Sequence, residues 1–112
     1  MREFYETVLG ATSGSRYQNS RTGFESYFMS FSDGGRVELM SQKSRGGAAP
    51  SGSALGYAHI ALALGGRAAV DEAVARLRGR GVTVVGEPRT TGDGFYEAVV
   101  EDPEGNTIEL VE

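Results

Sequence analysis

Residues 94–111 read GFYEAVVEDPEGNTIELV, and they align without a gap on residues 23–40, GFESYFMSFSDGGRVELM, at an offset of 71 positions. The two helix-ending glycines, Gly10 and Gly81, stand at the same offset. Such self-similarity predicts two copies of one unit, made of a helix, a strand, a hairpin and a strand. The identical pairs in the aligned stretches are Gly23/Gly94, Phe24/Phe95, Gly34/Gly105, Glu38/Glu109 and Leu39/Leu110.

Hydrophobic spacing predicts two helices and a larger number of short strands. Val70, Val74 and Leu77 recur at helical spacing within residues 67–80, and a shorter helix is expected at residues 1–9. Because the remaining apolar stretches alternate or run between glycines, they are typical of strands. The chain is therefore expected to be α+β. The expected strands are 11–18, 24–32, 36–42, 57–64, 82–86, 95–101 and 107–111.

The two copies differ at their starts. A strand at 57–64 precedes the second helix, whereas the first copy opens directly with its helix. Either the first unit lacks this strand by nature, or the chain begins at an internal Met of a longer reading frame. We favour the second interpretation, because Met1 falls inside a predicted helix with no N-cap residue before it.

The expected domain organisation follows from the repeat. Residues 1–112 are predicted to form a single domain, with an incomplete first module at 1–43 and a complete second module at 56–112. Residues 44–55 are rich in Gly, Ser and Ala, which is typical of a linker between the two.

Composition excludes several classes of function. The 112 residues contain no Cys, which rules out a disulfide scaffold, thiolate zinc sites and a cysteine nucleophile. The net charge of −4, with Arg and Lys scattered among carboxylates, argues against nucleic acid as a partner. No apolar run is long enough to span a membrane, and no signal peptide is visible. We therefore expect a soluble cytoplasmic protein.

Three strands each present one polar side chain on the face opposite their aliphatic side chains. These are Glu38, His59 and Glu109. One imidazole and two carboxylates suit a divalent ion such as Zn, Ni, Co, Mn or Fe. The alternative is that the two glutamates occupy the solvated side of a sheet and that the histidine is structural.

Other side chains are interpreted as structural. Four aromatic residues are expected in the core rather than around a substrate: Phe24, Tyr27, Phe28 and Phe31. Four arginines are candidates for contact with an anionic group but are interpreted as surface charges: Arg16, Arg21, Arg36 and Arg89. Neither a phosphate-binding glycine loop nor a Gly-x-Ser-x-Gly nucleophile elbow is present.

Four motifs, at residues 4–10, 36–40, 56–62 and 101–110, resemble in order the vicinal oxygen chelate superfamily. That superfamily contains glyoxalase I, bleomycin-resistance proteins and extradiol dioxygenases. The resemblance implies paired βαβββ modules that form a curved mixed sheet around a cavity, here with the first strand of module one absent from the chain. It also implies a homodimer and a small-molecule substrate. Charge and hydropathy, as above, leave neither nucleic acid nor membrane as an expected partner.

Carried over by motif, Glu38, His59 and Glu109 match three metal ligands of glyoxalase-like members, whose fourth ligand is a His on the absent strand. The presence of Glu38 favours a metal-dependent lyase or isomerase. In such an enzyme Glu109 is the catalytic base that removes the proton next to a carbonyl while the metal ion stabilises the enediolate. Two alternatives stay open: a metal-free small-molecule binding or resistance protein, and an Fe(II) extradiol dioxygenase.

Overall fold

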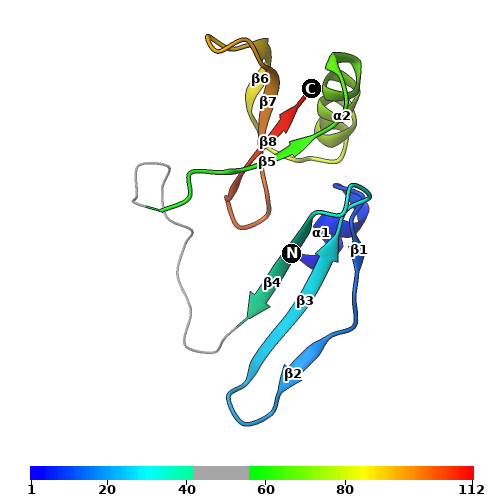
Figure 1. The fold of residues 1–112 in the computed structure, drawn as a ribbon, viewed down its shortest axis with the longest axis vertical. Helices are drawn as coiled ribbons and strands as arrows, with labels where there is room; N and C mark the ends of the chain where they lie inside the picture. Colours follow the sequence, from blue (N-terminus) through cyan, green and yellow to red (C-terminus); the bar gives the residue numbers. More distant parts are fainter. Residues whose placement is uncertain (42–55) are drawn as a thin grey trace. The chain divides into compact units, whose positions relative to one another are not determined.

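The computed structural model describes residues 1–41 and 56–112. The chain divides into two compact units, Met1–Gly47 and Ala48–Glu112, which are described here one at a time (Figure 1). The linker expected at 44–55 lies outside the described residues. No helix within the described ranges is long and apolar enough to cross a membrane.

Unit 1 is an antiparallel sheet with one short helix. Strand β3 is central: β4 pairs with it along one edge, and β1 and β2 pair with different parts of it. The single strand expected at 11–18 is interrupted at residues 14–16, and the break begins at Gly14, a residue type that weakens strands. The elements are α1 (Arg2–Thr7), β1 (Thr12–Ser13), β2 (Tyr17–Asn19), β3 (Phe24–Ser30) and β4 (Arg36–Ser41).

The core of unit 1 forms between α1 and one face of this sheet. Tyr5, Ala11 and Met29 are buried at its centre, and two of the four expected core aromatics, Tyr27 and Phe31, pack against them. The expectation was wrong for the other two, Phe24 and Phe28. They alternate with the core-facing residues of β3 and so lie on the opposite face, where Phe28 is 43% exposed.

Unit 2 is a complete βαβββ module. Its strand order is β5-β8-β7-β6, in which β5 runs parallel to β8 and the other pairs are antiparallel. This mixed sheet confirms the expected α+β class and the βαβββ module. The elements are β5 (Ile60–Ala63), α2 (Arg67–Gly79), β6 (Val84–Thr90), β7 (Tyr96–Glu101) and β8 (Thr107–Val111).

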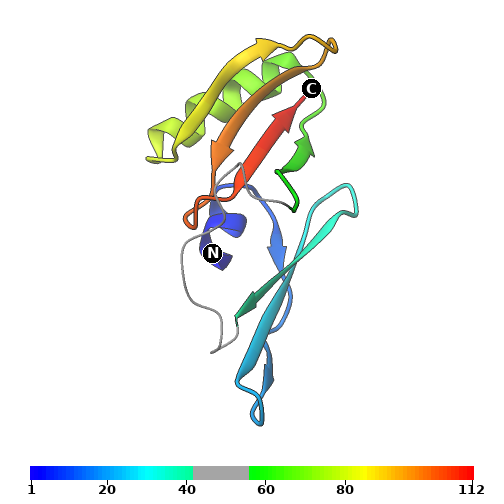
Figure 2. The ribbon, with the colours of Figure 1, turned by 90° about the vertical axis from the view of Figure 1, so that its left-hand side faces the viewer.

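Helix α2 covers one face of the unit 2 sheet (Figure 2). Its residues Val70, Val74 and Leu77 are buried, as is the sheet face that they meet. The buried side chains of that face are Ala98, Val100, Ile108 and Leu110. The helix therefore leaves the other face of the sheet free to carry polar groups.

Two strand boundaries of unit 2 differ from the sequence expectation by three or more residues. Strand β5 begins at Ile60, which pairs with Ile108, rather than at residue 57. In this parallel register residues 57 and 58 lie opposite residues 105 and 106, which precede β8. His59 thus precedes β5 instead of lying within it. Strand β6 extends to Thr90 rather than ending at 86, and it accommodates Pro88 through register shifts at the sheet edge.

Candidate functional site

The face of the unit 2 sheet opposite α2, called the open face below, carries a set of polar side chains. Its members are set by the register: Val99 of β7 and Ala61 of β5 are both direct partners of Glu109, so the three side chains share this face. Side chains on the open face also include Glu97 and Glu101 of β7, Thr107 and Val111 of β8, and Ala63 of β5.

His59 and Glu109 meet on the open face. His59 Nε2 lies 3.2 Å from Glu109 Oε2, and the two side chains are 40% and 20% exposed. The small side chain of Ala61, the strand partner of Glu109, leaves room for the imidazole two residues earlier in the chain. The structure therefore brings together two of the three side chains that the sequence analysis selected.

The geometry of this pair fits two ligands of one metal ion. Nitrogen and carboxylate oxygen ligands lie about 2.0–2.2 Å from zinc, so two neighbouring ligands of one ion are about 2.8–3.6 Å apart. The separation of His59 Nε2 and Glu109 Oε2 is 3.2 Å, which lies within this range. An imidazole and a carboxylate are also ligands that divalent transition metals accept.

Glu38 belongs to unit 1, where it lies on β4 opposite Phe28 and is exposed. Its side chain is on the sheet face away from the unit 1 core, since its neighbours Val37 and Leu39 pack against that core. Within residues 1–41 and 56–112, no group of three or more His, Cys, Asp or Glu side chains is positioned to hold a metal ion. The role of Glu38 as a third ligand thus stays a prediction.

Arg89 and Glu97 extend the open face toward β6. Arg89 Nη2 lies 3.3 Å from Glu97 Oε1, and the two residues are direct partners across β6 and β7. From the sequence, Arg89 is expected to be a surface charge, and Glu97 is not among the candidate site residues. The sequence feature that could have placed Arg89 on the open face is the neighbouring Pro88. A proline in a strand indicates an irregular edge, where the following side chain can change face.

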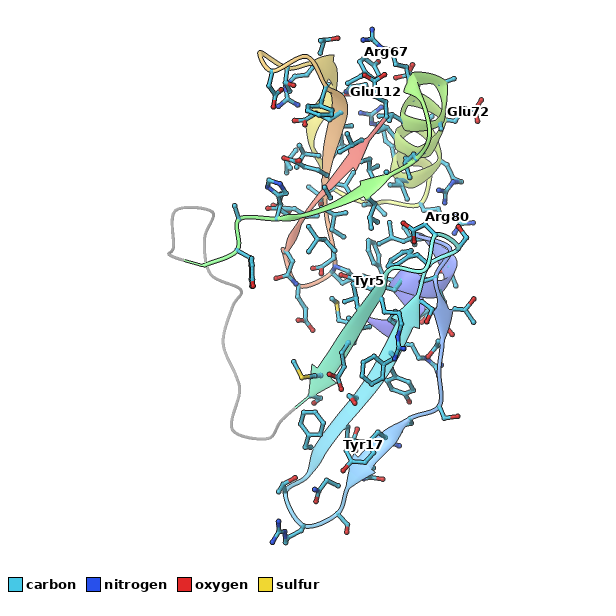
Figure 3. The ribbon with its side chains drawn as sticks, in the orientation of Figure 1. Tyr5, Tyr17, Arg67, Glu72, Arg80 and Glu112 are labelled. Atoms are coloured by element: carbon cyan, nitrogen blue, oxygen red, sulfur yellow. The ribbon has the colours of Figure 1, made fainter. Side chains whose placement is uncertain are left out.

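Polar contacts on the helix side tie α2 to the sheet and so support the open face. Arg67 Nε lies 3.1 Å from Glu112 Oε2, and the two labelled side chains approach each other in Figure 3. The Tyr96 hydroxyl donates a hydrogen bond of 2.7 Å to Asp71 Oδ1. This bond to a carboxylate, with partial desolvation, raises the pKa of Tyr96 above its usual value.

A family comparison identifies the class to which this fold and site belong. The model of the Glyoxalase/Bleomycin resistance protein/Dioxygenase superfamily matches residues 1–110, and the chain belongs to that superfamily. A search of curated proteins gives no match.

Solved structures share the fold across nearly the whole chain. A glyoxalase family protein from Enterococcus faecalis is 22% identical, with a TM-score of 0.81 over 99% of this chain and 85% of the other. A glyoxylase/bleomycin resistance protein/dioxygenase domain from Frankia sp. EAN1pec is 14% identical, with a TM-score of 0.84 over 98% and 84%. The trypanothione-dependent glyoxalase I of Leishmania major is 25% identical, with a TM-score of 0.77 over 98% and 74%.

Proposed function

We propose that this protein is a glyoxalase-like, metal-dependent lyase or isomerase that acts on a small, oxygen-rich substrate. The observation that carries the proposal is the His59–Glu109 pair, whose facing atoms are 3.2 Å apart on the open face of a superfamily member. The likeness to a glyoxalase I from Leishmania major supports the same reaction class. The proposal includes Glu38 as a third ligand and a cytoplasmic homodimer.

The metal would be held by His59 and Glu109, with Glu38 completing the set. When bound, a divalent ion supplies positive charge that polarises a substrate carbonyl and favours loss of the neighbouring proton.

Glu109 performs the proton transfer in this proposal. One carboxylate oxygen takes the proton from the carbon next to the carbonyl, while the electrons of the broken C–H bond shift toward the carbonyl. In an isomerisation, Glu109 returns the proton to the adjacent carbon, which leaves the carboxylate ready for another turnover. His59 lies beside Glu109 and restrains its orientation, and the small side chains of Ala61 and Ala63 leave space for a substrate on the open face.

The test is turnover of the hemithioacetal of methylglyoxal and glutathione by protein loaded with Ni²⁺ or Zn²⁺. Glu109→Gln keeps the shape of the side chain but removes both the base and a metal ligand, so kcat is expected to fall at least about 10²–10⁴-fold with an unchanged circular dichroism spectrum. Glu101→Gln is the matched control, because Glu101 lies on the same face one strand away. It is expected to keep wild-type turnover.

Two results contradict the proposal. One is full activity of Glu109→Gln, which excludes this residue as the base. The other is the absence of stoichiometric metal from protein that has been reloaded with Ni²⁺ or Zn²⁺, as measured by elemental analysis.

A further inference from the structure

Strand β6 is irregular in a way that changes which side chains reach the open face. Gly86 pairs with Val99 and Arg89 pairs with Glu97, and a register shift precedes each of these two pairs. In a regular strand, residues three apart point to opposite faces. Because each shift inserts one extra residue into β6, Gly86 and Arg89 both lie on the open face.

The missing side chain of Gly86 makes room for the Arg89 guanidinium. A Cβ atom built on Gly86 would lie 3.2 Å from Arg89 Nη1 and 3.0 Å from Val99 Cγ2, so the space above this glycine is already occupied. Arg89 Nη2 also contacts Glu97 Oε1 at 3.3 Å. The guanidinium therefore lies across the sheet beside Val99, and half of the side chain, 51%, stays exposed.

This position faces the proposed reaction centre. Val99 is the direct strand partner of both Gly86 and Glu109, so a single strand separates the glycine from the catalytic base. Since neighbouring strands are about 4.8 Å apart, the backbone positions of Gly86 and Glu109 are separated by about 10 Å. The four other arginines of residues 56–112 lie on α2 or immediately after it, at positions 67, 76, 78 and 80.

We propose that Arg89 binds a carboxylate of the substrate whose reacting carbonyl lies at Glu109, and that Glu97 holds the guanidinium in place. This inference rests on the proposed function and narrows its substrate class to compounds that carry a carboxylate. A guanidinium has five N–H donors, and the contact with Glu97 uses one of them, which leaves a pair of donors for a carboxylate. Across a backbone gap of about 10 Å, after both side chains reach inward, the carbonyl and the carboxylate would be the two ends of a chain of roughly four to six carbon atoms.

The test uses hydroxamates, which chelate divalent ions, with Ni²⁺-loaded protein in isothermal titration calorimetry. The probes are the mono-hydroxamates of succinate, glutarate and adipate, each compared with its uncharged methyl ester. Wild type is expected to bind at least one carboxylate probe about tenfold or more tightly than its ester. Arg89→Met is expected to reduce this preference to within about twofold, because it removes the hydrogen bonds between the guanidinium and the carboxylate of the probe.

Two further variants separate the role of Arg89 from side effects. Arg78→Met removes an arginine that is similarly exposed but pairs with Glu87 and lies on α2, so the preference should persist. The double variant R89M/E97Q removes the carboxylate left without its partner, and it should behave like Arg89→Met. If the double variant instead restores the preference, repulsion by Glu97 caused the loss and the proposal is overturned.

The remaining outcomes separate this inference from the proposed function. Equal binding of the carboxylate and ester probes by wild type overturns the role of Arg89 and leaves the metal centre intact. Failure of wild type to bind any hydroxamate contradicts the metal centre, and the inference falls with it.

Discussion

The last strands of the two units, β4 and β8, have the same local design and different surroundings. Glu38 pairs with Phe28 as Glu109 pairs with Val99, which are equivalent positions of the repeat. Both helices are followed by a glycine of positive φ, 74° at Gly10 and 78° at Gly81. Strand β8 has a neighbour on each side, whereas within the described residues β4 pairs with β3 alone.

This difference shows what the additional parallel strand contributes. In unit 2, β5 and the 13-residue helix α2 pack on β8, and Leu110 is 1% exposed. Its counterpart in unit 1, Leu39, is only partly buried below a helix of six residues. The segment that leads into β5 also brings His59 to Glu109, whereas residues 1–41 contain no histidine that could meet Glu38 in this way.

The largest expected difference between the units is in core stability. Leu110→Ala removes a fully buried side chain and is expected to lower the free energy of unfolding by about 2–5 kcal/mol. Leu39→Ala should lower it by less than about 2 kcal/mol, because less apolar area and a smaller cavity are involved. Urea denaturation followed by circular dichroism measures both. Equal losses would mean that the two cores support their last strands equally.

A second comparison concerns the hairpins before these strands. Asp102 is buried and accepts three hydrogen bonds, from the backbone N–H groups of Glu104 and Asn106 and from Asn106 Nδ2, at 2.8–3.0 Å. Asp33, in the equivalent hairpin of unit 1, accepts one from the Gly35 N–H and is exposed. Asp102→Ala is expected to cost about 1–3 kcal/mol, because three hydrogen bonds to a buried carboxylate are lost.

Asp33→Ala is the matched control for this hairpin. It should cost at most about 0.5 kcal/mol, as is usual for an exposed turn. Thermal unfolding measures the loss of stability in both variants. A larger loss for Asp33→Ala than for Asp102→Ala would contradict the claim that the Asp102 hairpin is the more strongly stabilised of the two.

The smallest expected effect is on a titration. The Asp71 carboxylate raises the pKa of Tyr96 by accepting a hydrogen bond from its hydroxyl group. In unit 1 the repeat position that corresponds to Tyr96 is Glu25, so this contact belongs to unit 2. Asp71→Asn should therefore lower the pKa of Tyr96 toward its usual value of 10.0, seen as earlier tyrosinate absorbance in an alkaline titration. Since the folded-state pKa is the raised one, the contact stabilises the fold fully below pH 10, and this stabilisation is lost as the pH rises through the raised pKa of Tyr96 in the folded state. Superimposable curves for both proteins would contradict this contact.

Local patterns in the sequence were enough to predict the repeat and the faces of its last strands. The glycines at equivalent positions marked the turns, and strict alternation in both strands placed Glu38 and Glu109 opposite the aliphatic residues. These features depend on neighbours in the chain, and sequence reasoning is strongest where local structure decides.

Features that depend on partner strands were beyond prediction. Residues 84–90 have no clean alternation, and their faces follow from register shifts against β7. The start of β5 depends on where β8 begins, and the exposure of Phe28 depends on which face of β3 meets α1. The 3.2 Å approach of His59 to Glu109 likewise needs the parallel pairing of β5 with β8.

The central claim is that His59 and Glu109 together hold a metal ion, and Ni²⁺ binding by equilibrium dialysis tests it most directly. Wild type and Glu101→Gln are each expected to bind one Ni²⁺ per protein chain, since each chain has one His59–Glu109 pair. His59→Ala and Glu109→Gln should each lose stoichiometric binding, because each removes one of two ligands that already lie 3.2 Å apart. Unchanged Ni²⁺ affinity in both variants would contradict the account.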